Sequence, residues 1–229
     1  MTPAPPKLIA CVRPINWAIE RLRRRRASLS RKKTDRVIKD DPASGPPLAL
    51  VQTTANRQIV VTLCPLARNQ GIRAGLSLAQ ARALCPTLVY AQHDSARDAK
   101  ALEALGRWMM RFTPTVQVAE GGLFLDVTGT QRLFGSLEKL LAKIHGALTN
   151  LRIPARLAIA PTPGAAWAMT FQTARSPIVT TDLSSALSPL PPLVLRLDDP
   201  TLAALHHLGL STVEQLLAIP RDLLPARFG

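Results

Sequence analysis

The side chains of this sequence that are best suited to chemistry are arginines and lysines, whose chemistry is the binding of anions. Twelve of its 29 Lys and Arg residues lie between Lys7 and Lys39, and the formal net charge of the 229-residue chain is +14. Arg23, Arg24 and Arg25 stand in the densest part of this run. Because local concentrations of positive charge attract phosphate-rich polymers, the sequence predicts a polyanion as partner.

Candidates for metal chemistry are few. Cys11, Cys64 and Cys85 are widely spaced, with no Cys-x-x-Cys pair and no His at ligand spacing, so we expect neither a zinc site nor a disulfide framework.

No apolar run approaches the ~20 residues of a membrane span, and the N-terminus lacks the apolar block of a signal peptide. We therefore expect a cytoplasmic protein with no membrane partner.

The elements that must position any site are organised around residues 115–135, TVQVAEGGLFLDVTGTQRLFG. Apolar and polar residues alternate on either side of the Gly121-Gly122 turn signal, which predicts a β-hairpin. Helical spacing follows, with Thr128 or Thr130 as the N-cap. The apolar side of this helix is made by Leu133, Leu137, Leu140, Leu141, Ile144 and Leu148.

Composition and apolar spacing assign the remaining segments of the chain to loops, strands and helices. Composition without periodicity predicts a basic loop over residues 23–47 and a Pro- and Ser-rich connection over residues 176–197. Apolar patterns predict strands at residues 8–12, 48–51, 59–63 and 155–160. They predict helices at residues 15–26, 78–84 and 98–112, and from Pro163 onward.

Residues 198–229 have the pattern of a helix-hairpin-helix. Asp199 is expected to cap the first helix, with Pro200 in its first position. Ser211 and Glu214 are expected to form a capping box for the second helix. Pro220 should end that helix.

The turn of this motif suggests a way to hold DNA. Backbone N–H groups at Gly209, Leu210, Ser211 and Thr212 would face a phosphate and grip it without reading bases. The alternative is a turn that serves helix packing alone. The adjacent His206 and His207 cannot share a helix face as ligands, and we expect one to be packed and the other exposed.

The run LFLDVTG at residues 123–129, followed by LFG and a helix, resembles the palm of Y-family translesion DNA polymerases. Residues 60–86 resemble that family's fingers: Arg68 matches an arginine that contacts the incoming triphosphate, while Pro65 replaces its tyrosine. The resemblance covers most of residues 8–229. It implies an α/β (α+β) fold with a palm (1–13 and 96–175), small fingers (14–95, including the basic loop) and a helical, helix-hairpin-helix thumb fragment (176–229).

The carboxylates that the resembling family uses for catalysis are absent. In the family register, Cys11 and Arg13 stand at two acidic positions of the first strand. Gly121 and Gly122 stand where the hairpin carries adjacent metal-binding Asp and Glu. Two-metal phosphoryl transfer needs clustered carboxylates, so the resemblance implies no catalysis, no metal and no cofactor.

Two further positions depart from the family pattern. Pro163 and Trp167 stand where the family has lysines that bracket the nucleotide phosphates. Glu120 and Asp126 are the only carboxylates near the hairpin that could substitute for the missing metal ligands.

These departures are similar to those of the polymerase-like subunit of the bacterial mutasome. They imply a non-enzymatic protein that binds DNA and serves as adaptor for an error-prone, replicative-type polymerase, together with a mutasome accessory protein, in SOS-type translesion synthesis. Sliding-clamp binding belongs to the longer family members, whose site this chain lacks, as a truncated form would. Two alternatives stay open: an active translesion polymerase that holds Mg²⁺ through Glu120, Asp126 or both, and a truncated product without function.

Overall fold

The computed structural model describes residues 7–31, 45–172 and 178–220. The chain divides into two compact units, Met1–Arg13 with Gly106–Gly229, and Pro14–Leu105. The boundary between the units thus follows Leu105, and residues 176–229 group with the first unit. The palm, fingers and thumb bounds that the resemblance implies stay predictions.

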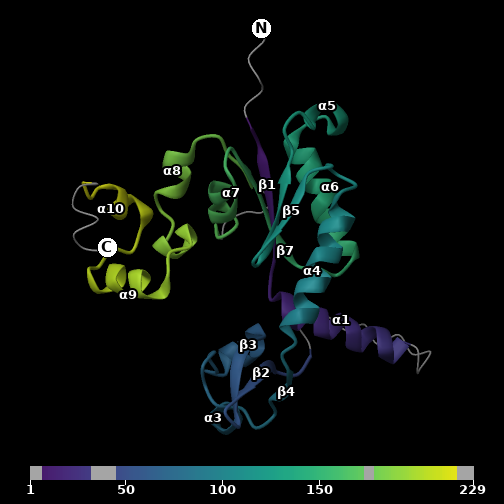
Figure 1. The fold of residues 1–229 in the computed structure, drawn as a ribbon, viewed down its shortest axis with the longest axis vertical. Coiled ribbons are helices and arrows are strands. Elements are labelled where there is room, and N and C mark those ends of the chain that lie inside the picture. The colour runs from purple at the N-terminus through teal and green to yellow at the C-terminus, as the bar shows by residue number, and fades with distance from the viewer. Residues whose placement is uncertain (1–6, 32–44, 173–177, 221–229) are drawn as a thin grey trace. The chain divides into compact units, whose positions relative to one another are not determined.

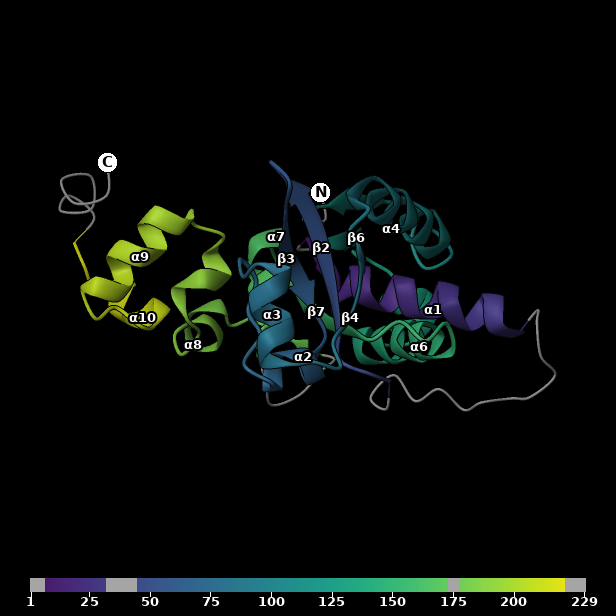
Figure 2. The ribbon, with the colours of Figure 1, turned by 90° about the horizontal axis from the view of Figure 1, so that it is seen from below.

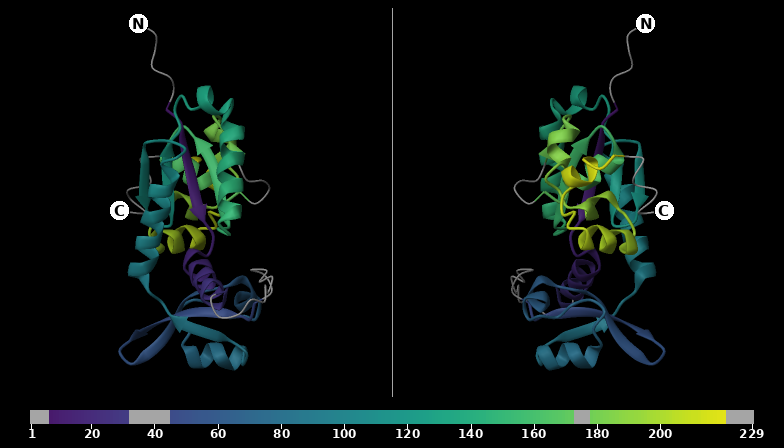
Figure 3. Two further views of the ribbon diagram at one scale, coloured as in Figure 1. Left: turned by 90° about the vertical axis from the view of Figure 1, so that its right-hand side faces the viewer. Right: turned by 90° about the vertical axis from the view of Figure 1, so that its left-hand side faces the viewer.

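A five-stranded sheet forms the centre of the first unit. Its strand order is β5 (Val116–Ala119), β6 (Gly122–Asp126), β1 (Ile9–Pro14), β7 (Ala155–Ala160), β8 (Ile178–Val179). β1 therefore lies in the middle of the sheet, where Figure 3 shows it as the purple strand. It runs antiparallel to β6, with Cys11 opposite Phe124.

The predicted hairpin is confirmed. β5 and β6 pair antiparallel with Ala119 opposite Gly122. The turn needs Gly121 because its φ of +77° lies in the left-handed region, which side chains with a Cβ disfavour. The alternation of apolar and polar residues on either side of a glycine turn was therefore sufficient to locate the hairpin.

Both faces of this sheet are covered by helices (Figure 1). On one face lies α6 (Leu137–Asn150), which buries Leu140, Leu141, Ile144 and Leu148, together with the C-terminal end of α4 (Ser95–Met109). On the other lies α7 (Pro163–Met169), whose Ala165 and Ala166 pack with Cys11 and Phe124. The predicted strand 155–160 and the helix from Pro163 are confirmed.

The single helix predicted after the hairpin is wrong, because the chain forms two. α5 (Gln131–Phe134) ends at Gly135, whose φ is +86°, and Ser136 starts α6 by accepting a hydrogen bond from the Lys139 N–H at 3.2 Å. Leu133, expected on the buried side, is 81% exposed. Glycine and serine in succession give a break and a new N-cap.

The segment expected as an irregular connection is structured. It contains α8 (Leu183–Leu187), capped by Asp182, and the 3₁₀ turn η1 (Pro192–Leu195). α9 (Asp199–His207) and α10 (Val213–Leu217) follow. Both predicted caps were displaced by one residue: Asp198 caps α9, and Thr212 with Gln215 forms the capping box of α10. Neighbouring Asp-Asp and Ser-Thr pairs offer two similar caps, and the pattern alone does not choose between them.

The second unit holds a three-stranded sheet of order β3-β2-β4 (Figure 2), and residues 95–105 of α4 also belong to it. Its core includes Ile19 and the fully buried β2 residues Ala49 and Val51. Its elements are α1 (Trp17–Arg31), β2 (Leu48–Thr54), β3 (Arg57–Leu63), α2 (Pro65–Asn69), α3 (Leu78–Leu84) and β4 (Val89–Gln92). The strands predicted at residues 48–51 and 59–63 and the helix predicted at residues 78–84 are confirmed. Ser77 caps that helix, and β2 and β3 are longer than predicted.

The basic loop predicted over residues 23–47 is wrong for its first part, because α1 continues to Arg31. Arginine is a good helix former, and two arginines are held on the helix surface. Arg23 pairs with Glu20 at 3.1 Å, and the Arg24 guanidinium lies 5.0 Å from the Trp17 ring centroid. Residues 32–44 lie outside the described residues. In the described part of the chain, no helix is long and apolar enough to cross a membrane.

Candidate functional site

The hairpin turn and the end of β1 form the part of the sheet where the resemblance places the family's metal ligands. Gly122 stands beside β1, and a Cβ built on it would lie 3.0 Å from the Val12 carbonyl oxygen and 3.7 Å from the Arg13 Cα. Cys11, two residues earlier, is fully buried in the sheet. The structure thus brings Cys11 on β1 close to Gly122 on β6 and to Gly121 in the turn before it, with no carboxylate among the three.

An indole occupies the space next to these glycines. A Cβ on Gly121 would lie 3.1 Å from the Trp167 Cη2, and one on Gly122 would lie 3.3 Å from its Cζ3. Trp167 lies on α7. This helix begins at Pro163 and is capped by Thr162, whose Oγ1 accepts a hydrogen bond from the Ala165 N–H at 3.2 Å. The small turn residues and the large ring therefore fit one another.

Arg13 lies against the same indole. Its Nε donates to the Thr170 Oγ1 at 2.8 Å and its Nη2 donates to the Thr170 carbonyl at 2.9 Å. Its guanidinium carbon is 4.0 Å from the Phe171 ring centroid and 5.8 Å from that of Trp167. These contacts hold the guanidinium in a fixed position between strand and helix.

Arg196 approaches from the other side, after η1. Its guanidinium carbon lies 4.3 Å from the Trp167 ring centroid, and its Nη2 donates to the Glu120 carbonyl at 2.9 Å. Arg196 itself has a φ of +60°, so the backbone there accepts a conformation that is uncommon for a residue with a side chain. We call Arg13, Trp167, Phe171 and Arg196 the arginine–tryptophan cluster.

The cluster is electrostatically the opposite of a cation site. Among the described residues, the ion pairs include no carboxylate partner for Arg13 or Arg196. Burial lowers the pKa of the Arg13 guanidinium. Burial raises the pKa of the Cys11 thiol to about 12, although the positive charges of Arg13 and Arg196 act in the opposite direction. Two guanidiniums and a protonated thiol would repel divalent cations or leave them unbound.

The two carboxylates that could substitute for the lost ligands are not near one another. Glu120 is exposed at the hairpin turn, before β6 begins, whereas Asp126 is the last residue of β6. The Asp126 Oδ1 accepts from the Thr128 N–H at 3.0 Å, and hydrogen bonds from Thr128 lower the pKa of that carboxyl. Because they lie at opposite ends of a strand, the geometry does not favour the alternative in which both hold one metal ion.

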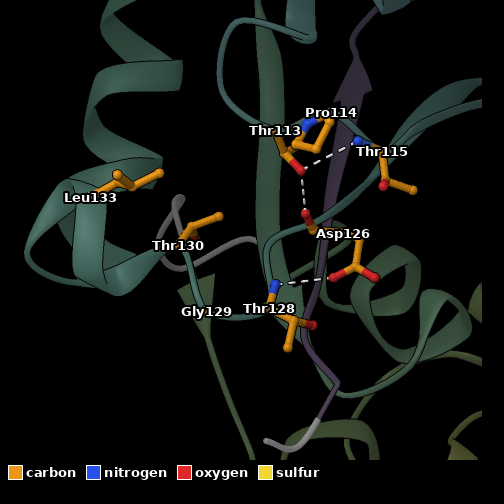
Figure 4. Close-up of a pocket in the computed structure, with 8 residues that line it drawn as sticks. All are labelled: Thr113, Pro114, Thr115, Asp126, Thr128, Gly129, Thr130 and Leu133. Carbon is orange, nitrogen blue, oxygen red and sulfur yellow. Dashed lines mark hydrogen bonds between the residues drawn. The ribbon is translucent and has the colours of Figure 1, made fainter.

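Asp126, at the end of β6 away from the hairpin turn, lines a shallow pocket of about 360 Å³ (Figure 4). The Thr113 hydroxyl donates to the Asp126 carbonyl there at 2.5 Å. The other lining residues are Pro114, Thr115, Thr128, Gly129, Thr130 and Leu133. Within the described residues, no three His, Cys, Asp or Glu side chains are grouped so that they could hold a metal ion.

The predicted phosphate contacts outside the sheet have mixed surroundings. Arg68 is exposed in the last turn of α2, a position open to a phosphate. Arg25 is also exposed, whereas Arg23 and Arg24 are partly buried by their contacts with Glu20 and Trp17. Arg25 and Arg68 thus remain predictions, and Arg23 and Arg24 have roles within α1.

The helix-hairpin-helix turn has its backbone donors engaged. The N–H groups of Ser211 and Thr212 both donate to the Gln215 Oε1, at 2.7 and 3.1 Å. Those of Gly209 and Leu210 donate to carbonyls of α9 at 3.0 Å each. The following two, on Val213 and Glu214, donate to the Leu190 and Ser188 carbonyls. The expected phosphate grip therefore has no free backbone donor at this turn, and the geometry favours the packing role. His206 and His207 are both exposed, not one packed and one exposed.

Sequence reasoning missed the cluster as a unit. It identified the replacements at Arg13 and Trp167 singly, but it had no signal for Arg196 or Phe171. A guanidinium that reaches 76 residues back to a backbone carbonyl leaves no local pattern.

Comparison with known proteins identifies the family of this chain. Residues 36–170 match the model of the impB/mucB/samB family, which is more than half of the chain. The chain belongs to this family. Among its relatives, Protein ImuB of Caulobacter vibrioides is 44% identical over 161 residues, which are 69% of this chain and 35% of ImuB. DNA polymerase IV of Bacillus anthracis is 27% identical over 203 residues, which are 84% of this chain and 48% of that protein.

Solved structures agree on the fold of this impB/mucB/samB member. DinB from Sulfolobus solfataricus matches with a TM-score of 0.72 at 16% identity, covering 97% of this chain and 63% of that one. An insertion ternary complex of Dbh DNA polymerase matches with a TM-score of 0.70, also at 16% identity, and covers 96% of this chain and 63% of that one. The fold is thus an α/β Y-family polymerase fold, as the sequence predicted. The chain spans about a third of ImuB and about half of polymerase IV.

Proposed function

We propose that this chain is a DNA-binding, polymerase-shaped protein that does not transfer nucleotides, and that it serves DNA damage tolerance in the cytoplasm as an adaptor for an error-prone polymerase. The arginine–tryptophan cluster carries the proposal. It occupies the hairpin end of the palm sheet, where two-metal transfer needs grouped carboxylates. The likeness to ImuB and to DNA polymerase IV supports a role in translesion synthesis, with a mutasome accessory protein as a further partner.

The DNA half of the proposal rests on charge. The net charge of +14 favours a polyanion. Arg25 and Arg68 are exposed on the second unit and can reach phosphates without breaking an internal contact that the structure describes. Such contacts give affinity without sequence preference and make binding fall with salt.

An active polymerase is the less favoured function. Glu120 or Asp126 alone would give a metal ion one carboxylate, and the strand between them keeps the two from acting together. The guanidinium of Arg196 also lies next to Glu120, bonded to its backbone oxygen. A cation placed at Glu120 would therefore meet a fixed positive charge.

The test is a primer-template experiment with binding and extension followed in parallel. We expect binding whose logarithm falls linearly with the logarithm of salt concentration, and no extension with Mg²⁺ or Mn²⁺ on undamaged or abasic templates. Arg25→Ala and Arg68→Ala should each weaken binding and lower the salt slope by about 1, whereas Lys143→Ala, on α6, serves as the matched control. Salt-independent binding would contradict the DNA half. Extension that is lost in Glu120→Ala or Asp126→Ala would contradict the rest.

A further inference from the structure

A row of aromatic rings lies at the surface of the first unit where α4 ends and α5 begins. The Trp108 and Phe112 rings meet edge to face with centroids 6.0 Å apart, and those of Phe112 and Phe134 are 6.5 Å apart. All three rings are partly exposed, and Leu133, beside Phe134, is the most exposed of the large apolar side chains in the described residues, at 81%. We call Trp108, Phe112, Leu133 and Phe134 the aromatic strip.

The shallow pocket adjoins one end of this strip. Leu133 forms one side of the pocket, and Thr113 and Pro114, which follow Phe112, form another (Figure 4). The strip therefore continues into a depression in which a side chain from another molecule could be partly buried. Large exposed apolar side chains next to a concavity are typical of interaction surfaces and not of plain solvated faces.

Cations surround the aromatic strip. The Arg111 guanidinium carbon lies 4.1 Å from the Trp108 ring centroid, and the Lys143 Nζ lies 5.1 Å from that of Phe134. The neighbouring side chains of Arg107, Arg132 and Lys139 are also exposed. Exposed carboxylates on the same segments are fewer than these cations, and one of them is Glu138 on α6, next to Lys139. The rim is thus positive around an apolar centre.

We propose that the aromatic strip binds a segment of a partner protein in which apolar side chains are flanked by aspartates or glutamates. The proposal rests on the adaptor role proposed above, since an adaptor needs a surface that takes another protein. Apolar residues of the segment would cover Leu133 and the ring edges. Its carboxylates would lie opposite Arg111 and Lys143, which supply the charge complementarity that selects an acidic partner.

Two other occupants fit this surface less well. Bases of single-stranded DNA stack on open ring faces. Here the chain's own cations lie over the faces of Trp108 and Phe134, and Trp108 meets Phe112 edge to face. A second copy of the chain would bring two positive rims together, which like charges oppose. An acidic, apolar protein segment meets neither obstacle.

The experiment selects the ligand without assuming its sequence. The whole chain is immobilised and used to enrich a random peptide library displayed on phage, in parallel with Leu133→Asp and with Leu84→Asp. Leu84 is the matched control, because it is also an exposed leucine on a helix, at 51%, but lies on α3. Circular dichroism confirms that each variant is folded, which is expected for changes at exposed positions.

We expect the wild-type chain and Leu84→Asp to enrich peptides that combine Leu, Phe or Trp with Asp or Glu. By fluorescence anisotropy, these peptides should bind Leu133→Asp at least ~10-fold more weakly, the effect of one interface hot spot. Arg111→Glu with Lys143→Glu should weaken them as strongly. Peptides that are basic, peptides that bind Leu133→Asp equally well, or no enrichment at all would overturn the proposal.

The same proteins separate this proposal from the proposed function. Leu133→Asp should bind primer-template DNA as the wild type does and should not extend a primer. Peptide results that go against the strip, together with intact salt-dependent DNA binding, would refute the docking surface alone. The proposed function would be refuted by a wild-type chain that fails to bind DNA, or by one that extends a primer, whatever the peptides do. Concentration-dependent self-association that Leu133→Asp abolishes would instead identify a second copy as the occupant.

Discussion

Replacing Gly121 by alanine probes the fit between the hairpin turn and Trp167. The new Cβ would lie 3.1 Å from the Trp167 Cη2, closer than ordinary van der Waals contact. The ring cannot easily move away, because guanidiniums of Arg13 and Arg196 lie 5.8 and 4.3 Å from its centroid. The φ of +77° adds a second cost that is independent of the ring.

The two costs can be separated with Gly129. Its φ is +76°, nearly that of Gly121, and nothing lies within 4 Å of a Cβ built on it. Gly129→Ala should therefore lower the free energy of unfolding by the left-handed backbone cost alone, roughly 1–2 kcal/mol. Gly121→Ala should lower it by that amount plus about 1–3 kcal/mol for overpacking against the ring.

A double-mutant cycle then tests the contact itself. In a Trp167→Ala background, Gly121→Ala should cost only what Gly129→Ala costs, giving a coupling energy of about 1–3 kcal/mol. Urea denaturation followed by circular dichroism gives the free energies, since tryptophan fluorescence is itself altered by the second substitution. If Gly121→Ala costs no more than Gly129→Ala, or costs the same with and without the indole, then Trp167 does not pack on the turn as described.

Arg196→Ala removes a hydrogen bond to the hairpin and the contact with the indole, so the free energy of unfolding should fall by roughly 1–2 kcal/mol. The control Arg132→Ala, at an exposed position, should lower it by less than about 0.5 kcal/mol. Equal effects of the two substitutions would count against the cluster. The pKa of Asp126 is lowered by hydrogen bonds from its threonine neighbour, so its stabilising contribution is present above the unfolded pKa of ~3.9 and is lost as pH falls through the lower folded value. Asp126→Asn should thus be less stable than wild type at neutral pH and approach it in acid, and a constant difference would refute this. The Cys11 thiol, buried and with its pKa raised to about 12, should react with Ellman's reagent only after denaturation, and fast labelling of native protein would contradict its place in the sheet.

Elements set by a few consecutive residues could be predicted from the sequence. The hairpin needed only alternation and a glycine turn, and the helix over residues 78–84 needed only a short apolar pattern and a serine before it, which the structure shows as the cap of α3. Where two adjacent residues have the same capping chemistry, as with Asp198 and Asp199, the prediction was off by one because tertiary packing makes the choice.

Composition misled where a residue type has two uses. Residues 23–26 fell both in the helix predicted over residues 15–26 and in the loop predicted over residues 23–47. Arginine also favours a helix, and α1 extends through them to Arg31. Conversely, Leu133 fitted the apolar side of one long helix, and only the break at Gly135 exposes it. The sequence shows the type of each residue but not whether its side chain is buried or exposed.

The candidate site was half predictable. The resemblance places Cys11, Gly121 and Gly122 at the family's carboxylate positions, which stays a prediction. What replaced the carboxylates could not be found, because the contact of Arg196 with the Glu120 carbonyl joins residues 76 apart and depends on how η1 packs. Long-range contacts of this kind are not encoded in any short window of sequence.

Guanidiniums and an indole lie where the resemblance places the family's catalytic metal ions, and on this we base the absence of nucleotide transfer. Electron paramagnetic resonance of Mn²⁺, titrated into the chain with primer-template DNA, tests it most directly. We predict that the chain binds no Mn²⁺ beyond what the same DNA binds alone, and that the result is unchanged in Glu120→Ala and Asp126→Ala. Stoichiometric Mn²⁺ binding to the chain that either substitution abolishes would contradict the account.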